Sequence, residues 1–170
     1  GIEALDRILL VCPGQMVVVG GRPKMGKTHL MISLLSNVAR LYERPTLFVS
    51  AEMNEMQIGE RIATSDADLG ETADDVRGAK EVVLDKWRGV PIYFDDKPKT
   101  LGAALMSIRV QKKQLDISAA AVDYLQLLKL PPSTSRERQV AEASSAFKRL
   151  SMELDIPIFV VAQLNRSCEF

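Results

Sequence analysis

The 170-residue sequence is poor in the features that mark several specialised classes of protein. It has only two cysteines, Cys12 and Cys168, which stand far apart without a partner motif, so a disulfide scaffold is excluded. Its longest apolar runs, such as residues 17–19 and 158–162, fall far short of the roughly 20 residues that a membrane helix needs. We therefore expect a soluble protein of a reducing, cytosolic compartment, with no membrane partner.

Charge of one sign is not in excess, and aromatic residues are few. Lys and Arg total 22 and Asp and Glu total 22, so the formal net charge is zero. No overall positive field would hold a nucleic acid by charge alone. Phe, Trp and Tyr make up 5% of the residues, which argues against base stacking as a grip on DNA. Any DNA contact must be local, through the backbone phosphates.

The rest of the composition is that of an ordinary globular domain. Hydrophobic residues make up 46% and charged residues 26%, which excludes a disordered or collagen-like chain. A length of 170 residues suits one domain with a single hydrophobic core.

Apolar runs of strand length alternate with helical patterns, which is typical of an α/β domain with a mostly parallel central sheet flanked by helices. The near-continuous valines of the first strand predict burial on both of its faces. In the first helix, Leu30, Leu34, Leu35, Val38 and Leu41 are predicted to form one buried stripe. About five strands are predicted, over residues 16–20, 46–51, 91–95, 117–124 and 157–162, with helices over 27–41, from an N-cap at Thr100 to about Gln114, and over 136–154.

The strongest local signal is the segment of residues 21–28, which matches the phosphate-loop pattern G-x-x-x-x-G-K-[ST] at every fixed position. A buried strand runs into this segment and a helix runs out, so its backbone N–H groups can converge on a phosphate at the helix N-terminus. Lys27 would then reach the β- and γ-phosphates, and the Thr28 hydroxyl would bind Mg²⁺. The alternative is a glycine turn that only caps a helix. The predicted nucleotide-binding residues are Gly21, Arg22, Pro23, Lys24, Met25, Gly26, Lys27 and Thr28.

Three polar residues follow predicted strands and are candidates for the rest of such a site. Asp123 ends the apolar run 117–122, where an acidic partner for the metal belongs. Glu52 follows the second strand and could orient the water that attacks the γ-phosphate. Gln163 follows the fifth strand and could sense that phosphate through its amide. The alternatives are a turn residue for Asp123, an exposed turn glutamate for Glu52 and a surface amide for Gln163.

Taken together, these motifs resemble the motor domain of the DnaB-family replicative helicases, which has a RecA-like fold. The resemblance covers almost the whole chain. It is carried by GIEALDRIL, PGQMVVVGGRPKMGKT, LFVSAEM, AVDYLQLL and VVAQLNRS, which follow one another in the family's order. The motifs DYLQLL and AQLNR are more specific to this family than the phosphate loop, because the related RecA recombinases lack them.

The resemblance implies roles for single residues. Glu52 becomes the catalytic base, Lys27 and Gln163 act on the γ-phosphate, and Asp123 holds Mg²⁺, through water, beside Thr28. Arg166 is implied to couple the nucleotide state to loops that face DNA. Arg136, Arg138 and Arg166 are the candidate DNA contacts, with solvated surface residues as the alternative.

The resemblance also implies a biological setting. It predicts an ATP- and Mg²⁺-dependent motor of a hexameric ring that moves along single-stranded DNA and unwinds duplex, in the cytoplasm of a bacterium or of a phage's bacterial host. Primase and a helicase loader are further expected partners. We expect residues 1–170 to be a single ATPase core, without the family's N-terminal collar and without its C-terminal arginine-finger segment. Hydrolysis by the isolated chain should therefore be slow.

Two other functions fit parts of the pattern. A RecA-like assembly or regulatory module would bind ATP and form rings or filaments without unwinding DNA. A small-molecule kinase shares the phosphate loop, but the sequence offers no arginine-rich lid, and the position of Glu52 suits a water nucleophile.

Overall fold

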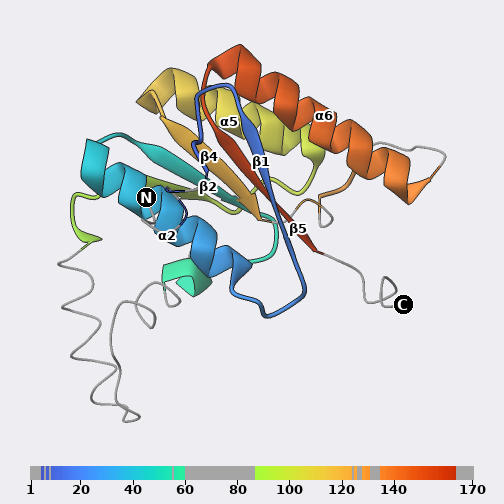
Figure 1. Cartoon of the computed structure of the whole chain (residues 1–170), viewed down its shortest axis with the longest axis horizontal. Helices are drawn as coiled ribbons and strands as arrows, with labels where there is room; N and C mark the ends of the chain where they lie inside the picture. Colours follow the sequence, from blue (N-terminus) through green and yellow to red (C-terminus); the bar gives the residue numbers. More distant parts are fainter. Residues whose placement is uncertain are drawn as a thin grey trace, which may run out of the picture.

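A computed structural model gives the fold of the chain (Figure 1). It describes residues 5, 7, 9–54, 56–59, 87–123, 125, 128–130 and 135–163. Arg166 and Cys168 lie outside these residues.

The described residues form one parallel sheet of five strands, which confirms the predicted fold class. The strands lie in the order β1-β5-β4-β2-β3, and every neighbouring pair is parallel. Their carboxyl ends therefore meet at one edge of the sheet, where open α/β sheets bind ligands. The strands are β1 (Met16–Gly21), β2 (Thr46–Ser50), β3 (Ile92–Asp95), β4 (Ala119–Asp123) and β5 (Ile158–Gln163).

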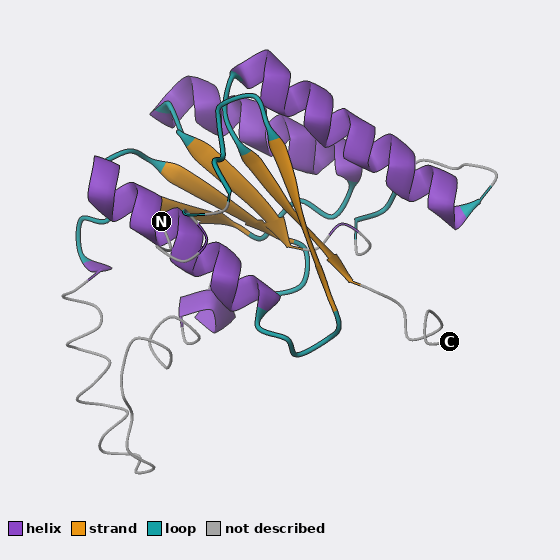
Figure 2. Cartoon of the chain, viewed as in Figure 1, coloured by secondary structure: helices purple, strands orange, loops and turns teal. Residues whose placement is uncertain are grey.

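Helices cover both faces of the sheet (Figure 2). Helix α2 (Lys27–Tyr42) packs on one face, and α5 (Leu101–Leu115) and α6 (Arg136–Leu154) pack side by side on the other. The predicted N-cap of α5 is confirmed, because the Thr100 side chain accepts a hydrogen bond from the Ala103 N–H at 3.1 Å. Among the described helices, none is both long enough and apolar enough to span a bilayer.

Each face of the central strands contributes to a separate hydrophobic cluster, because successive side chains of a strand point to opposite faces. In β2, Leu47 and Val49 join the cluster under α5 and α6, whereas Phe48 joins the cluster under α2. In β4, Ala120 and Val122 likewise join the cluster under α5 and α6, whereas Ala121 joins the cluster under α2. Both faces of β2 and β4 are buried. Each of these strands nevertheless ends in a polar residue, at the carboxyl end of the sheet.

Two expectations about burial are wrong. Strand β1 is not buried on both faces: it lies at an edge of the described sheet, paired with β5, and Val18 is 53% exposed. The predicted stripe of the first helix is also shifted, since Leu41 is 66% exposed whereas Met31 and Ile32 are buried. A run of apolar residues reports hydrophobicity, but the place of a strand in the sheet order decides which faces are covered.

Candidate nucleotide-binding site

The loop between β1 and α2 has the backbone shape of an anion-binding turn. Gly26, the N-cap of α2, has φ = 77°, and Lys24 has φ = 64°, so two residues of the loop adopt the left-handed conformation. Such turns point successive N–H groups toward one centre. Gly26 provides no side-chain cap for α2, which leaves the first N–H groups of the helix free to meet a phosphate.

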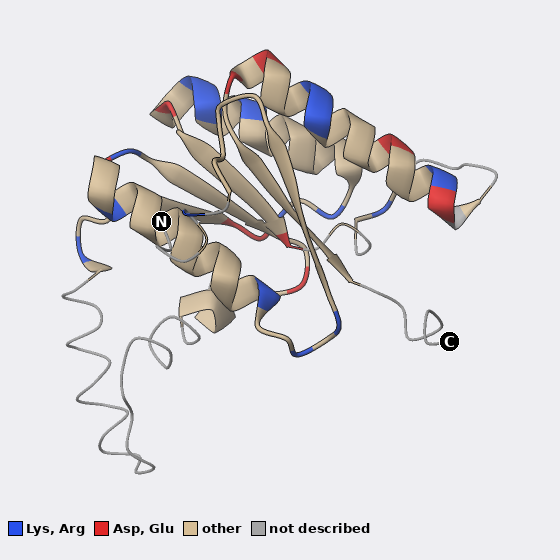
Figure 3. Cartoon of the chain, viewed as in Figure 1, with Lys and Arg blue, Asp and Glu red and all other residues tan. Residues whose placement is uncertain are grey.

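Lys27 folds back over this loop. Its Nζ donates a hydrogen bond to the Arg22 carbonyl oxygen at 2.6 Å, so the ammonium group is held at the mouth of the loop. Gly21 makes room for this arrangement, because a Cβ there would lie 3.2 Å from Lys27 Cδ. Together with Arg22 and Lys24, Lys27 concentrates positive charge on the loop that follows β1 (Figure 3). The loop is thus both shaped and charged for an anion.

The structure joins the loop to the predicted acidic partner. The Thr28 hydroxyl donates a hydrogen bond to Asp123 Oδ2 at 2.5 Å, although the two residues are 95 positions apart. Thr28 is 8% exposed and Asp123 is 2% exposed. A hydroxyl beside a carboxylate is a pair of hard oxygen ligands, which suits Mg²⁺. Among the residues that the structure describes, no group of three or more His, Cys, Asp or Glu side chains could hold a metal.

Glu52 and Gln163 also lie at the carboxyl edge of the sheet. Gln163 is the last residue of β5 and pairs with Gly21 of β1. Glu52 follows β2, whose last residue Ser50 pairs with Asp123 of β4. Because β1, β5, β4 and β2 are consecutive neighbours, the ends that carry these residues are adjacent. The Glu52 side chain is exposed.

Two hydrogen bonds at this edge of the sheet could not be predicted from any sequence motif. The buried Ser50 hydroxyl accepts a hydrogen bond from the Met53 N–H at 2.8 Å, and Lys99 Nζ donates to the Ala51 carbonyl oxygen at 3.2 Å. Both contacts fix the turn that carries Glu52. Lys99 is 47 positions from Glu52 in the sequence, so only the folded chain reveals it.

Of the three candidate DNA contacts, the structure describes the side chain of Arg138. Arg138 lies in the first turn of α6, where the Ser135 hydroxyl caps its N–H at 3.3 Å. The side chain of Arg136 and the whole of Arg166 are outside the description. Glu137 lies between the first two, and a hydrogen bond from its own N–H, with a further one from Ser135, lowers the pKa of its carboxyl group.

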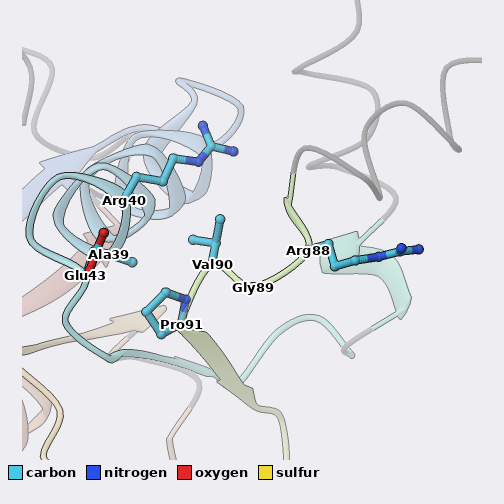
Figure 4. Close-up of a pocket in the computed structure, with 7 residues that line it drawn as sticks. All are labelled: Ala39, Arg40, Glu43, Arg88, Gly89, Val90 and Pro91. Atoms are coloured by element: carbon cyan, nitrogen blue, oxygen red, sulfur yellow. The ribbon is translucent and has the colours of Figure 1, made fainter.

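A hollow lies at the C-terminal end of α2, away from the phosphate loop (Figure 4). It has a volume of about 370 Å³ and is lined by the last turn of α2 and by residues 88–91. Figure 4 shows the Arg88 side chain pointing away from the hollow, and the Arg40 guanidinium lies 4.3 Å from the ring centre of Trp87. The two cations therefore do not converge on one anion, and the hollow lies away from the carboxyl edge of the sheet.

The fold and the site define a P-loop nucleotide-binding domain: a parallel sheet whose first strand ends in a phosphate loop and whose fourth strand ends in a buried aspartate.

Comparison with known proteins specifies the family. A sequence model of the DnaB-like helicase C terminal domain matches residues 1–170, and the chain belongs to this family. The replicative DNA helicase DnaB of Buchnera aphidicola subsp. Schizaphis graminum is 33% identical over 171 residues, and that of Leifsonia xyli subsp. xyli is 32% identical over 166 residues. Each match covers 92% of this chain and 36% of the relative.

A solved structure agrees at the level of the fold. The chain is similar, with a TM-score of 0.77 and 21% identity, to a solved DnaB-like replicative helicase described with its interactions with primase. That match covers 92% of this chain and 40% of the solved one. The predicted RecA-like fold and the predicted family are thus confirmed, and membership of the family implies that the chain binds a nucleotide. The chain spans little more than a third of the length of the two curated relatives.

Proposed function

We propose that the chain is the ATP-hydrolysing motor core of a hexameric replicative helicase, with residues 1–170 as one ATPase unit. The observation that carries this proposal is the hydrogen bond of 2.5 Å between Thr28 and Asp123. It brings the end of the phosphate loop to the end of β4, as shared binding of one Mg²⁺ requires. A glycine turn that merely capped a helix would need no buried carboxylate beside it.

The substrate is ATP, bound by the loop of residues 21–28. The loop N–H groups surround the phosphates, and Lys27 moves from the Arg22 carbonyl oxygen to the β- and γ-phosphate oxygens. The Thr28 hydroxyl and, through water, Asp123 would hold Mg²⁺, which would neutralise charge on the phosphate oxygens. Lys27 thereby exchanges a neutral carbonyl oxygen for anionic phosphate oxygens, which form stronger hydrogen bonds with its ammonium group, and this favours ATP binding.

Hydrolysis uses residues of the neighbouring strand ends. Glu52 accepts a proton from the attacking water, and Gln163 contacts the γ-phosphate from the end of β5. Gln163 can report the state of that phosphate because its backbone pairs with Gly21, at the start of the loop. An arginine finger from a neighbouring subunit would complete the site, so the isolated chain turns over slowly.

The wider setting is proposed from the named relatives. They are replicative DNA helicases of bacteria, and the solved neighbour is described with primase. We place the chain in a bacterial or phage-infected cytoplasm, in a ring that translocates on single-stranded DNA and separates duplex. Arg136, Arg138 and Arg166 are its proposed DNA contacts, and primase and a helicase loader are proposed partners.

Two substitutions test the assignment of the site. Lys27→Ala should abolish detectable binding of a fluorescent ATP analogue, whereas Glu52→Gln should bind it normally and hydrolyse ATP about 100-fold more slowly. Glu43→Gln, an exposed glutamate at the far end of α2, is the matched control and should change neither measurement. Normal hydrolysis by Glu52→Gln would show that the base lies elsewhere.

Single-stranded DNA tests the motor function. In a full-length version, the rate of ATP hydrolysis should rise when single-stranded DNA is added. A rate of ATP hydrolysis that does not change when single-stranded DNA is added would favour an assembly or regulatory module over a helicase.

A further inference from the structure

We infer that Lys99 is a positioning residue that aims Glu52 at the attacking water. The inference rests on the proposed function, in which Glu52 is the base. Lys99 belongs to no motif, and it lies in the loop between β3 and α5.

The contact is to the peptide bond that precedes Glu52. Lys99 Nζ donates to the Ala51 carbonyl oxygen at 3.2 Å. Because a peptide group is planar, that carbonyl lies in one plane with the nitrogen and the Cα of Glu52. Holding the oxygen therefore fixes the plane from which the Glu52 side chain departs.

The other hydrogen bonds of this turn hold the residues on either side of the Ala51 carbonyl group, whereas Lys99 holds that carbonyl group itself. The Ala51 N–H donates to the Asp123 carbonyl oxygen at 2.7 Å, and the Met53 N–H donates to the Ser50 hydroxyl at 2.8 Å. These bonds tie the two flanks of the turn to β4 and to β2. Glu52 itself is exposed, so packing does not set its direction and the backbone must do so.

Lys99 can serve this purpose because its own backbone is held. The Lys129 N–H donates to the Lys99 carbonyl oxygen at 2.9 Å, and the Leu101 N–H donates to the Lys129 carbonyl oxygen at 3.2 Å. At the start of the loop, the Lys97 N–H donates to Asp95 Oδ1 at 3.1 Å. The loop is thus fastened to the end of β3 and to residues 128–130, which follow β4. Lys99 thus links residues 128–130 to the Glu52 turn.

The expected consequence is kinetic. An exposed hydrogen bond contributes little to folding stability, so its loss should leave the fold intact. A small displacement of a catalytic base, in contrast, slows the chemical step without changing how the substrate binds. Loss of the Lys99 contact should therefore lower kcat and leave KM unchanged.

The experiment compares steady-state hydrolysis of ATP·Mg²⁺ by Lys99→Met, Lys99→Arg and Lys97→Met. Lys99→Met should lower kcat about three- to tenfold, the scale of an ordinary solvent-exposed hydrogen bond, with KM and the melting temperature unchanged. Lys99→Arg keeps a donor of similar reach and should recover part of the rate. Lys97→Met removes the same charge from the same loop and should match the wild type.

A second background identifies the residue through which Lys99 acts. In Glu52→Gln, the Lys99→Met substitution should cause no further loss, because the group that Lys99 aims is already disabled. A wild-type kcat in Lys99→Met would overturn the inference, as would an equal loss in Lys97→Met or an undiminished loss in the Glu52→Gln background. Normal hydrolysis by Glu52→Gln alone would instead overturn the proposed function, and the inference with it.

Discussion

The hydrogen bond between Thr28 and Asp123 should stabilise the fold measurably even without nucleotide or metal. Thr28→Val replaces the hydroxyl with a methyl group of nearly the same size, in a side chain that is 8% exposed. Asp123, at 2% exposure, then keeps its buried charge but loses the donor that lies 2.5 Å away. Burial prevents water from replacing that donor fully.

The magnitude follows from the charge of the acceptor. A hydrogen bond to a charged group contributes about 1.5–3 kcal/mol, so we expect Thr28→Val to lower the free energy of unfolding by that amount. In a domain of this size the melting temperature should fall by roughly 3–12 °C. Thr28→Ser keeps the hydroxyl and loses one methyl group, which costs about 0.8 kcal/mol. The valine variant should therefore be clearly the less stable of the two.

Urea denaturation of the single and double variants isolates the pair. In the Asp123→Asn background no buried charge depends on the hydroxyl, so Thr28→Val should cost at least about 1 kcal/mol less there than in the wild type. An equal cost in both backgrounds would show that the two side chains do not interact, and with it the geometric basis of the proposed metal site would be lost.

Two further predictions concern packing and pH. Leu35→Ala should lower the free energy of unfolding by about 2–5 kcal/mol, because Leu35 is fully buried on the inner face of α2. Leu41→Ala, on the exposed face of the same helix, should change it by less than about 0.5 kcal/mol, and equal effects in urea denaturation would contradict the described burial. The two hydrogen bonds of 2.8 and 2.7 Å from Arg109 lower the pKa of the Glu153 carboxyl group, so this pair stabilises the fold above the ordinary glutamate pKa and ceases to do so as the pH falls through the lowered value. Glu153→Gln should therefore lower the melting temperature slightly at neutral pH, and the difference should shrink at high salt and as the pH falls below the ordinary glutamate pKa. A difference that does not shrink in acid would refute this account.

The features that could be predicted are those that depend on residues close together in the sequence. The alternation of apolar runs and helical patterns predicted all five described strands and the three long helices, with bounds that differ from the structure by a few residues. The N-cap at Thr100 was predictable because a cap bonds to an N–H only three residues ahead. The phosphate loop was recognisable because its glycines, lysine and threonine fall within eight positions.

Pairing between distant segments could not be predicted in this way. Hydrophobicity marks Met16–Gly21 as a strand, but the sheet order β1-β5-β4-β2-β3 makes it an edge strand and leaves Val18 exposed. The DNA contacts proposed at Arg136, Arg138 and Arg166 stay predictions, because the side chain of Arg136 and the whole of Arg166 lie outside the described residues.

By itself, the sequence determined which segments become strands and helices, where the phosphate loop lies, and which family the chain resembles. Only the tertiary structure decided that Thr28 meets Asp123 and that Lys99 reaches the peptide before Glu52. The reason is physical: helix and strand patterns arise from interactions a few residues apart, whereas the arrangement of the site depends on which strands become neighbours. That choice is made by burial of both faces of the sheet at once, and no local pattern records it.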